Sequence, residues 1–205
     1  MVGENASFKF SIIEYNQIDE IVDIHYKALP NDLLPMFGKY IMKEYYKNAI
    51  KLNDGFIIGA LDNSNLIGFV YLSEGKNNFF KLLNQRCILK LITKSFKILF
   101  QKPIIVFSLL KSLFSGNEYD KYDSQIAYIA IDKAYQGMGI GSFLLKKVST
   151  ISINKKIHSC FTKTLSENFH VINMYKKLFP DATVYKVFSD FKRNYSLIGW
   201  TFIAL

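Results

Sequence analysis

The pattern of hydrophobic and polar positions along the chain predicts a mixed α+β protein. Apolar residues that recur every three or four positions are typical of helices packed on one side, and short apolar or alternating runs between turn residues are typical of strands. The expected helices are residues 18–29, 34–52, 78–101, 104–114, 142–153 and 168–179. The expected strands are residues 7–14, 56–62, 66–73, 124–132, 157–165, 183–189 and 194–205.

A glycine-rich turn joins the strand at 124–132 to the helix at 142–153. It reads Gln136-Gly137-Met138-Gly139-Ile140-Gly141. Glycine allows positive φ and a close approach of the backbone to another molecule. The first turn of the helix has unpaired N–H groups, and its dipole favours an anion. The turn is therefore a candidate pyrophosphate site, with a plain connecting turn as the alternative; its spacing fits neither a Walker loop nor a dinucleotide fingerprint.

Two stretches resemble the motifs of one family. Residues 136–145 resemble the acetyl-CoA-binding motif of the GNAT superfamily of N-acetyltransferases, Arg/Gln-x-x-Gly-x-Gly/Ala after an apolar strand. Residues 168–179 resemble its second motif, Asn-x-x-Ala-x-x-Phe/Leu-Tyr-x-Lys-x-Gly-Phe. The resemblance implies a GNAT-like fold of the α+β (mixed α/β) class. Such a fold has a mostly antiparallel twisted sheet of about seven strands, a splayed strand pair, and helices on both faces.

The same resemblance implies that acetyl-CoA is the co-substrate and assigns its contacts. Backbone groups of Ile129 and Ile131 would pair with the pantetheine amides, and Asn168 would hydrogen-bond the same arm. Main-chain N–H groups of the turn would hold the pyrophosphate; these belong to Gln136, Gly137, Met138, Gly139, Ile140, Gly141 and Ser142.

The second motif also supplies a predicted catalytic residue, Tyr175. A phenol has an ordinary pKa of about 10, so it keeps its proton at neutral pH and can pass it to a departing thiolate. The alternative is that Tyr175, one of 13 tyrosines, only packs in the core.

The general base is less well defined by the sequence. Related sequences often have a glutamate on the motif strand where this chain has Gln125, which cannot act as a base. Asp123, Tyr128 or a water chain are the candidates, and we include Asp123 among the predicted catalytic residues. Glu14 and His25 are weaker candidates.

Three positions depart from the family pattern. Gln136 replaces the commoner Arg and removes one charge near the phosphates. Val171 replaces a small Ala, and Phe179-Pro180 stands where the family has Gly-Phe. These changes affect the coenzyme contacts of the second-motif helix and the way the chain leaves it.

Charge is concentrated in one segment. The chain of 205 residues has a net charge of +9, and residues 76–115 hold eight Lys or Arg and no acid. We expect one acetyltransferase domain, 1–205, with a basic helical hairpin inserted at about 76–115. The insertion is a helical lid, a binding surface for an anionic acceptor such as a nucleotide-linked amino sugar, or a peripheral contact with an anionic membrane. Nucleic-acid binding is not expected.

Other sequence features mainly exclude classes of protein. Cys87 and Cys160 are expected to be reduced thiols, and three scattered histidines predict no metal site. The absence of a signal-like segment and of a long apolar run predicts a cytoplasmic protein without a spanning helix.

The leading hypothesis is an N-acetyltransferase acting by direct attack of a small-molecule primary amine. Its first half resembles small-molecule enzymes of bacterial surface-sugar pathways. The alternatives are a non-catalytic acyl-CoA-binding or membrane-peripheral module and a protein N-acetyltransferase. The sequence does not specify an oligomeric state.

Overall fold

One seven-stranded sheet organises the molecule. This computed structural model describes residues 8–75, 81–83, 121–190 and 193–202. The strands are β1 Lys9–Ile12, β2 Gly55–Asp62, β3 Asn65–Glu74, β4 Ser124–Ile131, β5 Ser159–Leu165, β6 Thr183–Asp190 and β7 Arg193–Thr201. Their order is β1-β2-β3-β4-β5-β7-β6, and β4–β5 is the parallel pair in an otherwise antiparallel sheet. The predicted mixed class and mostly antiparallel sheet are confirmed.

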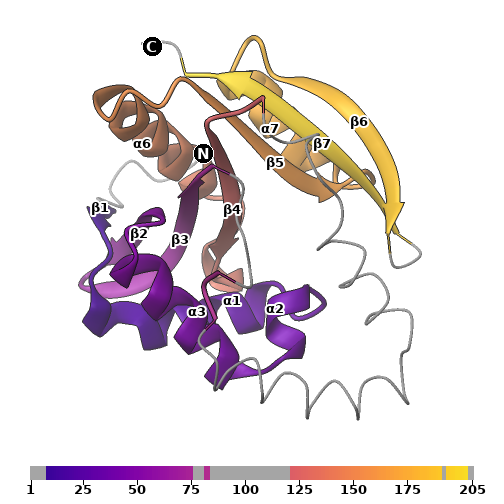
Figure 1. Cartoon of the computed structure of the whole chain (residues 1–205). Helices are drawn as coiled ribbons and strands as arrows, with labels where there is room; N and C mark the ends of the chain where they lie inside the picture. The colour runs from indigo at the N-terminus through magenta and orange to yellow at the C-terminus, as the bar shows by residue number, and fades with distance from the viewer. Residues whose placement is uncertain (1–7, 76–80, 84–120, 191–192, 203–205) are drawn as a thin grey trace.

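Helices cover both faces of this sheet (Figure 1). The α-helices are α1 Ile18–Ala28, α2 Leu33–Met36, α3 Lys39–Lys51, α6 Ile140–Asn154 and α7 Phe169–Leu178, with short 3-10 turns at Tyr15–Gln17 and Lys133–Tyr135. One buried cluster joins α1–α3 to one face and is rich in tyrosine. The other joins α6 and α7 to the opposite face around Trp200. Burial of these two apolar layers supplies the main stabilisation of the fold.

The single helix predicted at 34–52 is wrong, because the chain breaks at Gly38. Gly38 has φ of 85°, a conformation that favours glycine, and separates α2 from α3. Asp32 is the N-cap residue of α2.

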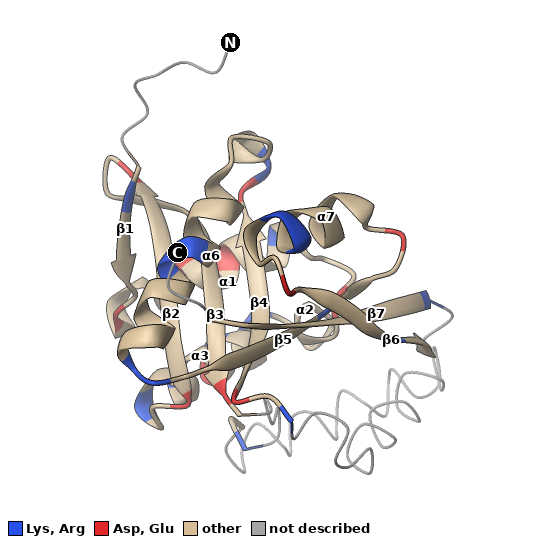
Figure 2. Ribbon diagram, turned by 90° about the horizontal axis from the view of Figure 1, so that it is seen from above, with Lys and Arg blue, Asp and Glu red and all other residues tan. Residues whose placement is uncertain are grey.

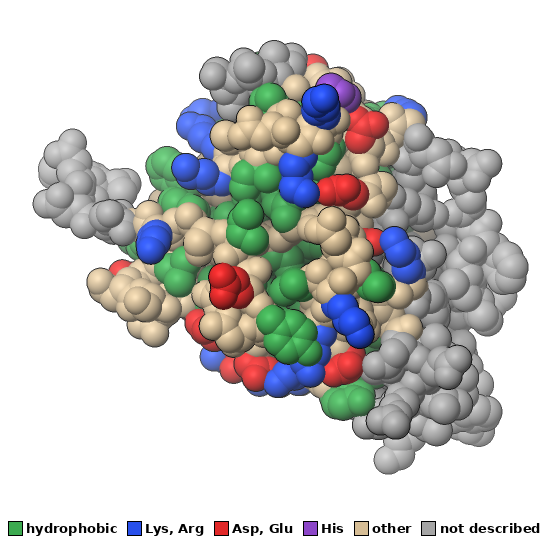
Figure 3. Space-filling view, turned by 60° about the vertical axis from the view of Figure 1, so that its left-hand side comes forward, with side chains coloured by type: hydrophobic (Ala, Val, Ile, Leu, Met, Phe, Trp, Pro, Cys, Tyr) green, Lys and Arg blue, Asp and Glu red, His purple; other side chains and the backbone are tan. Residues whose placement is uncertain are grey.

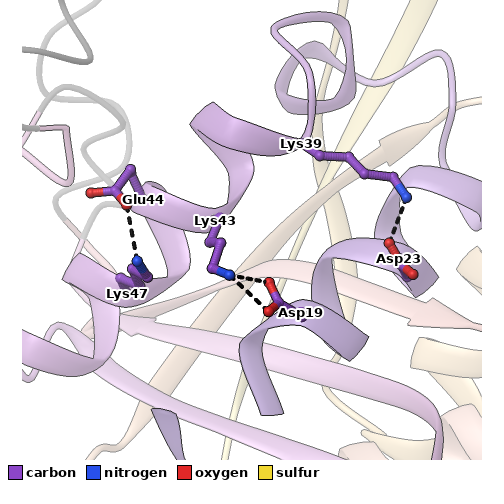
Figure 4. Close-up of polar contacts among 6 residues, drawn as sticks. All are labelled: Asp19, Asp23, Lys39, Lys43, Glu44 and Lys47. Carbon is purple, nitrogen blue, oxygen red and sulfur yellow. Dashed lines mark hydrogen bonds and ion pairs between the residues drawn. The ribbon is translucent and has the colours of Figure 1, made fainter. Parts of the chain in front are cut away.

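Exposed ion pairs link α1 to α3 (Figure 4). Lys39 Nζ lies 2.6 Å from Asp23 Oδ1, and Lys43 Nζ lies 2.6 Å from Asp19 Oδ1. Solvent-exposed pairs of this kind contribute about 0–1 kcal/mol each. The two helices are therefore held mainly by their buried faces.

The parallel pair β4–β5 is short, which confirms the predicted splay. Its register covers three pairs, from Ser124 opposite Cys160 to Ile126 opposite Thr162. The β3–β4 register instead continues to Ile131, with an extra residue in β4 between Ile126 and Tyr128. Such a bulge bends a strand. Figure 1 shows β5, β7 and β6 leaving the direction of β2–β4 as a separate arm.

The expected helical hairpin at 76–115 lies outside the described residues, apart from residues 81–83. Leu82 and Leu83 are buried in the α1–α3 cluster. The Leu82 carbonyl accepts from Asn48 Nδ2 at 3.0 Å, and Lys81 Nζ lies 2.9 Å from the buried carboxylate of Asp54. The beginning of the inserted segment is therefore anchored on the end of α3 and the start of β2.

Charges of both signs are mixed on the surface in Figure 3, where hydrophobic side chains lie between them. Among the described residues, no helix is long and apolar enough to cross a membrane.

Candidate active site

The glycine-rich turn is open to solvent at the end of β4. Gly137 and Gly139 have φ of 82° and 80°. A Cβ added at Gly137 would have no heavy atom within 4 Å, and one at Gly139 would meet Phe143 at 3.8 Å. The backbone from Gln136 to Gly139 is exposed, and α6 begins at Ile140. The turn therefore lies open to solvent at a helix N-terminus, where unpaired main-chain N–H groups favour a pyrophosphate. The Gln136 N–H is an exception, because it donates to the Lys133 carbonyl at 3.4 Å.

The third glycine of the turn is the least constrained. A Cβ at Gly141 would lie 3.6 Å from Met174 Sδ of α7 and 3.9 Å from Ile129 Cδ1 of β4, which are ordinary van der Waals distances. Gly141 is also not one of the glycines with positive φ, so alanine would fit at this position, as the Gly/Ala alternative of the family motif allows.

Exposed lysines lie on the two helices that meet near Gly141. Lys146 and Lys147 belong to α6, and Lys176 and Lys177 to the last turn of α7. Figure 2 shows basic residues on both helices.

The free edge of β4 begins where its pairing with β5 ends. Asp132 donates its N–H to Ile67 on the β3 side at 2.8 Å. Backbone groups alternate between the two edges of a strand, so the N–H and C=O groups of Ile129 and Ile131 face the β5 side. In the described register this side of Ile129 and Ile131 has no strand partner. The two predicted residues therefore present backbone groups on the open edge.

Two side chains from the motifs lie at this opening. Gln136 Nε2 donates to the Ile131 carbonyl at 3.0 Å, so this side chain folds back on the free edge. Asn168 Oδ1 accepts from Val171 N at 3.3 Å and caps α7. The cap uses the side-chain oxygen of Asn168, and the Nδ2 donor stays available for the predicted contact.

Tyr175 is brought to the point where the strands separate. Its side chain is 1% exposed, and its ring lies 5.0 Å from that of Trp200. Burial raises the pKa of Tyr175 above its ordinary value, and nearby Thr162 counters part of the rise. Thr162 Oγ1 itself donates to the Ile126 carbonyl at 3.2 Å, at the last β4–β5 pair. The Tyr175 hydroxyl makes no hydrogen bond of good geometry, and buried hydroxyls without a partner are uncommon.

The structure places Asp123 at the opposite, closed end of the β4–β5 pair. Its Oδ2 accepts from His158 N at 2.9 Å and from Ser159 N at 3.0 Å. These bonds use the carboxylate to connect the starts of both strands. Asp123 and Tyr175 are thus not brought together, and this placement argues for a structural role of Asp123.

The other candidate bases differ in their surroundings. His25 is fully buried with Nδ1 2.6 Å from the Tyr46 hydroxyl, and burial lowers the pKa of His25 to about 3. Burial raises the pKa of Tyr128, which keeps its proton. Gln125 lies within the closed three-residue register, and Glu14 caps the 3-10 turn at Tyr15–Gln17. Among the described residues, no cluster of His, Cys, Asp or Glu could hold a metal ion.

Sequence reasoning missed one residue at the opening, Thr162. Its position is known from the register of β5 with β4, where Thr162 lies opposite Ile126, and no sequence motif marks it.

Comparison with known proteins agrees with the fold and the motifs. The family model described as "Acetyltransferase (GNAT) family" matches residues 18–179. No curated protein matches the chain in sequence.

Several solved structures share the fold at low identity. The ribosomal-protein-S18-alanine N-acetyltransferase of Escherichia coli has a TM-score of 0.60 and 10% identity over 97% of this chain and 96% of that one. An N-acetyltransferase of Staphylococcus aureus has a TM-score of 0.63 and 11% identity over 96% and 99%. A protein proposed to be an acetyltransferase, from Salmonella typhimurium and solved with its cofactor acetyl-CoA, has a TM-score of 0.62 and 14% identity over 97% and 96%.

The family model spans most of the chain, including β4, the glycine-rich turn and α7. Members of this family use acetyl-CoA as the acyl donor. The chain belongs to the GNAT family of acetyltransferases.

Proposed function

We propose that this enzyme transfers the acetyl group of acetyl-CoA to a primary amine of a small molecule by direct attack. The observation that carries the proposal is the β4–β5 pair, which stops after three residue pairs and leaves a free strand edge leading to an open glycine-rich turn. An extended amide-containing chain can pair with such an edge as an added strand would.

The donor contacts follow from the residues at this edge. Ile129 offers its N–H and C=O groups and Ile131 its N–H group to the pantetheine amides, and Asn168 Nδ2 donates to the same arm. The Ile131 carbonyl already accepts from Gln136 Nε2. Main-chain N–H groups of Gly137 to Ser142 hold the pyrophosphate, while the Gln136 N–H donates to the Lys133 carbonyl. When bound, acetyl-CoA supplies an activated acetyl thioester, and the chain holds it in place, which can contribute several kcal/mol to catalysis.

Tyr175 is the proposed general acid. Its raised pKa keeps the phenol protonated at neutral pH. Its hydroxyl makes no hydrogen bond of good geometry within the protein that would have to break before the hydroxyl donates a proton to the leaving sulfur. A proton donor in place at that moment typically contributes 10²–10⁴-fold to the rate.

Direct attack is favoured over an enzyme-bound acetyl group. Cys160 is the cysteine among the described residues, and burial raises the pKa of its thiol to about 12. A neutral, buried thiol is a poor nucleophile.

The finer proposal for the acceptor is a nucleotide-linked amino sugar. The concentration of eight basic residues without an acid in residues 76–115 supports an anionic acceptor. Lys and Arg clusters stabilise the phosphates of such a compound.

Titration calorimetry with acetyl-CoA and CoA tests the donor site. We expect saturable binding, and no binding at millimolar concentration would refute the proposal.

The Tyr175→Phe variant tests the acid. We expect turnover to fall by about 10²-fold or more with little change in CoA affinity or stability, because the lost hydroxyl makes no hydrogen bond of good geometry. Tyr71→Phe is the matched control: it removes a buried hydroxyl that donates to Asp54 at 2.9 Å. This control should lose stability and keep turnover. Wild-type turnover in Tyr175→Phe would remove Tyr175 from the mechanism.

A further inference from the structure

An exposed aromatic ring lies one helical turn after the glycine-rich turn. Phe143 is 52% exposed, and its N–H donates to the Gly139 carbonyl at 3.2 Å. A Cβ at Gly139 would lie 3.8 Å from Phe143 Cε2, so the ring borders the turn itself. Met138, directly before Gly139, is 41% exposed. Large apolar side chains that stay exposed together beside a binding site are candidates to contact the ligand.

The first strand of the sheet supports the Phe143 ring. The ring centroid lies 6.1 Å from that of Phe10 on β1, with the two planes tilted by 38°. Phe10 is held in the sheet opposite Ala60 of β2 and packs against the buried cluster around Trp200. The contact with Phe10 therefore orients the ring, while more than half of the surface of Phe143 stays accessible.

A lysine accompanies this ring. Lys146 follows Phe143 by three residues, so both lie on the same exposed side of α6. The Lys146 Nζ lies 5.9 Å from the centroid of the Phe143 ring. An aromatic face binds a nucleobase by stacking, and an ammonium binds a phosphate. The pair therefore offers the two contacts that a 3′-phosphorylated adenosine requires.

The position of the pair fits the nucleotide end of the coenzyme. The free edge of β4, where we place the pantetheine arm, lies on the β5 side of the strand. Phe143 instead contacts β1, at the other edge of the sheet. Figure 1 shows α6 and β1 on the side of the molecule away from the arm formed by β5, β7 and β6. A coenzyme with its pyrophosphate at the turn would therefore extend its pantetheine toward β5 and its adenosine toward Phe143.

We propose that Phe143 stacks on the adenine ring of the coenzyme and that Lys146 binds its 3′-phosphate. This inference rests on the proposed function and specifies the residues that recognise the donor of that same site. The pyrophosphate turn and the free edge of β4 contact only the phosphates and the pantetheine arm. The preference for complete acetyl-CoA over shorter pantetheine donors therefore depends on these two side chains.

Three probes of decreasing length test the role of Phe143. They are CoA, dephospho-CoA, which lacks the 3′-phosphate, and 4′-phosphopantetheine, which lacks the nucleotide. Phe143→Ala should raise the Kd of CoA and of dephospho-CoA by about 5- to 100-fold in titration calorimetry, the effect of one lost base–aromatic stack. The Kd of 4′-phosphopantetheine, measured by ligand-observed NMR, should change less than about twofold. Phe143→Tyr keeps a flat ring and should retain most of the CoA affinity.

Lys146→Gln separates the phosphate contact from the stacking contact. It should raise the Kd of CoA by about tenfold, the effect of one lost hydrogen bond to a charged group. The Kd of dephospho-CoA should stay within about twofold of the wild-type value, because this probe has no 3′-phosphate. Lys146→Arg should restore part of the CoA affinity.

Tyr15 and Lys47 form a matched pair for the control. Tyr15 is 56% exposed, and Lys47 Nζ lies 5.7 Å from the centroid of its ring. Lys47 belongs to α3, which covers the opposite face of the sheet from α6. Tyr15→Ala and Lys47→Gln remove the same kinds of side chain without touching the turn, so both should bind the three probes as wild type does.

Saturation-transfer NMR on CoA gives a second measurement without turnover. In wild type, the adenine H2 and H8 protons should receive saturation as strongly as the pantetheine methyl groups, and in Phe143→Ala the adenine signals should fall relative to the methyl signals. Unchanged CoA affinity or equal losses for all three probes in Phe143→Ala, or equal losses for CoA and dephospho-CoA in Lys146→Gln, would overturn the inference. In these cases CoA binding by the wild type would leave the proposed function intact, whereas a wild type that does not bind CoA would refute the function itself.

Discussion

The two ends of the β4–β5 pair have opposite structures although they belong to the same two strands. At the closed end, Ser124 Oγ donates to the Ser159 carbonyl at 2.8 Å, and Asp123 accepts from His158 and Ser159. At the open end, Ile129 and Ile131 have no strand partner on the β5 side in the described register. Short polar side chains cross-link the strands at one end, and a bulge bends them apart at the other.

This difference separates stability from binding along one strand. Residues that close the pair use their hydrogen bonds internally, so their loss should weaken folding. Residues at the open end keep backbone groups for a ligand, so changes there should weaken binding. The predictions below test this separation, beginning with the largest effect.

Gly139→Glu should raise the Kd for CoA more than 100-fold, because a carboxylate would enter the phosphate site. Gly75→Glu is the matched control. Gly75 has φ of 74° and open space around a Cβ, but it lies at the closed end, where its N–H donates to the Asp123 carbonyl. Both variants should lose about 1 kcal/mol of stability through the left-handed backbone. Calorimetry that finds equal CoA affinity in the two variants would contradict the phosphate site.

Asp123→Ala should lower the free energy of unfolding by about 2 kcal/mol, because two hydrogen bonds to a carboxylate are lost. Asp181→Ala is a comparable change away from the pair, since Asp181 Oδ2 accepts from the backbone and side chain of Thr201. Urea unfolding should show similar losses, with turnover of the folded protein retained in both. A large loss of turnover in Asp123→Ala alone would instead support the predicted role of Asp123 as base.

The smallest effect concerns His25, whose ring packs 4.5 Å from that of Tyr128 in the open segment. The pKa of His25 is about 3 in the folded protein and about 6.5 when unfolded. The unfolded state therefore binds a proton as the pH falls below about 6.5, and stability decreases toward lower pH. We expect about 1.9 kcal/mol to be lost between pH 7 and 5 through this group.

His25→Gln removes this titration. Urea unfolding at pH 7, 6 and 5 should therefore give a flatter pH dependence for the variant. If the free energy of unfolding depends on pH equally in wild type and variant, His25 has the same pKa in the folded and unfolded states, which would contradict this prediction.

Local sequence signals predicted the parts of the site that are built locally. The glycine-rich turn and the capping Asn168 lie within or next to single elements, so spacing was sufficient to find them. The splay of β4 and β5 was expected from the family resemblance. The register accounts for it, because the pairing stops after three residue pairs. Thr162 lies opposite Ile126 only through the β4–β5 register, and a single polar residue has no periodicity, so its place at the last pair required the fold.

The prediction of a single helix at 34–52 was wrong for a related reason. The apolar periodicity continues through Gly38, and only the left-handed conformation of that residue divides the segment. A pattern of side chains does not report a backbone angle, so the division that gives α2 its position was not visible in the sequence.

The anchoring of Lys81 has a practical consequence for anyone who shortens this protein. The carboxylate of Asp54 is 4% exposed and accepts hydrogen bonds from Tyr71, Ser73 and Lys81. A trimmed version that joins β3 directly to β4 would strip this acid of its cation and uncover the apolar surface beneath Leu82 and Leu83. A truncation that keeps residues through 83, or that pairs the deletion with Asp54→Asn, is the version that should remain folded.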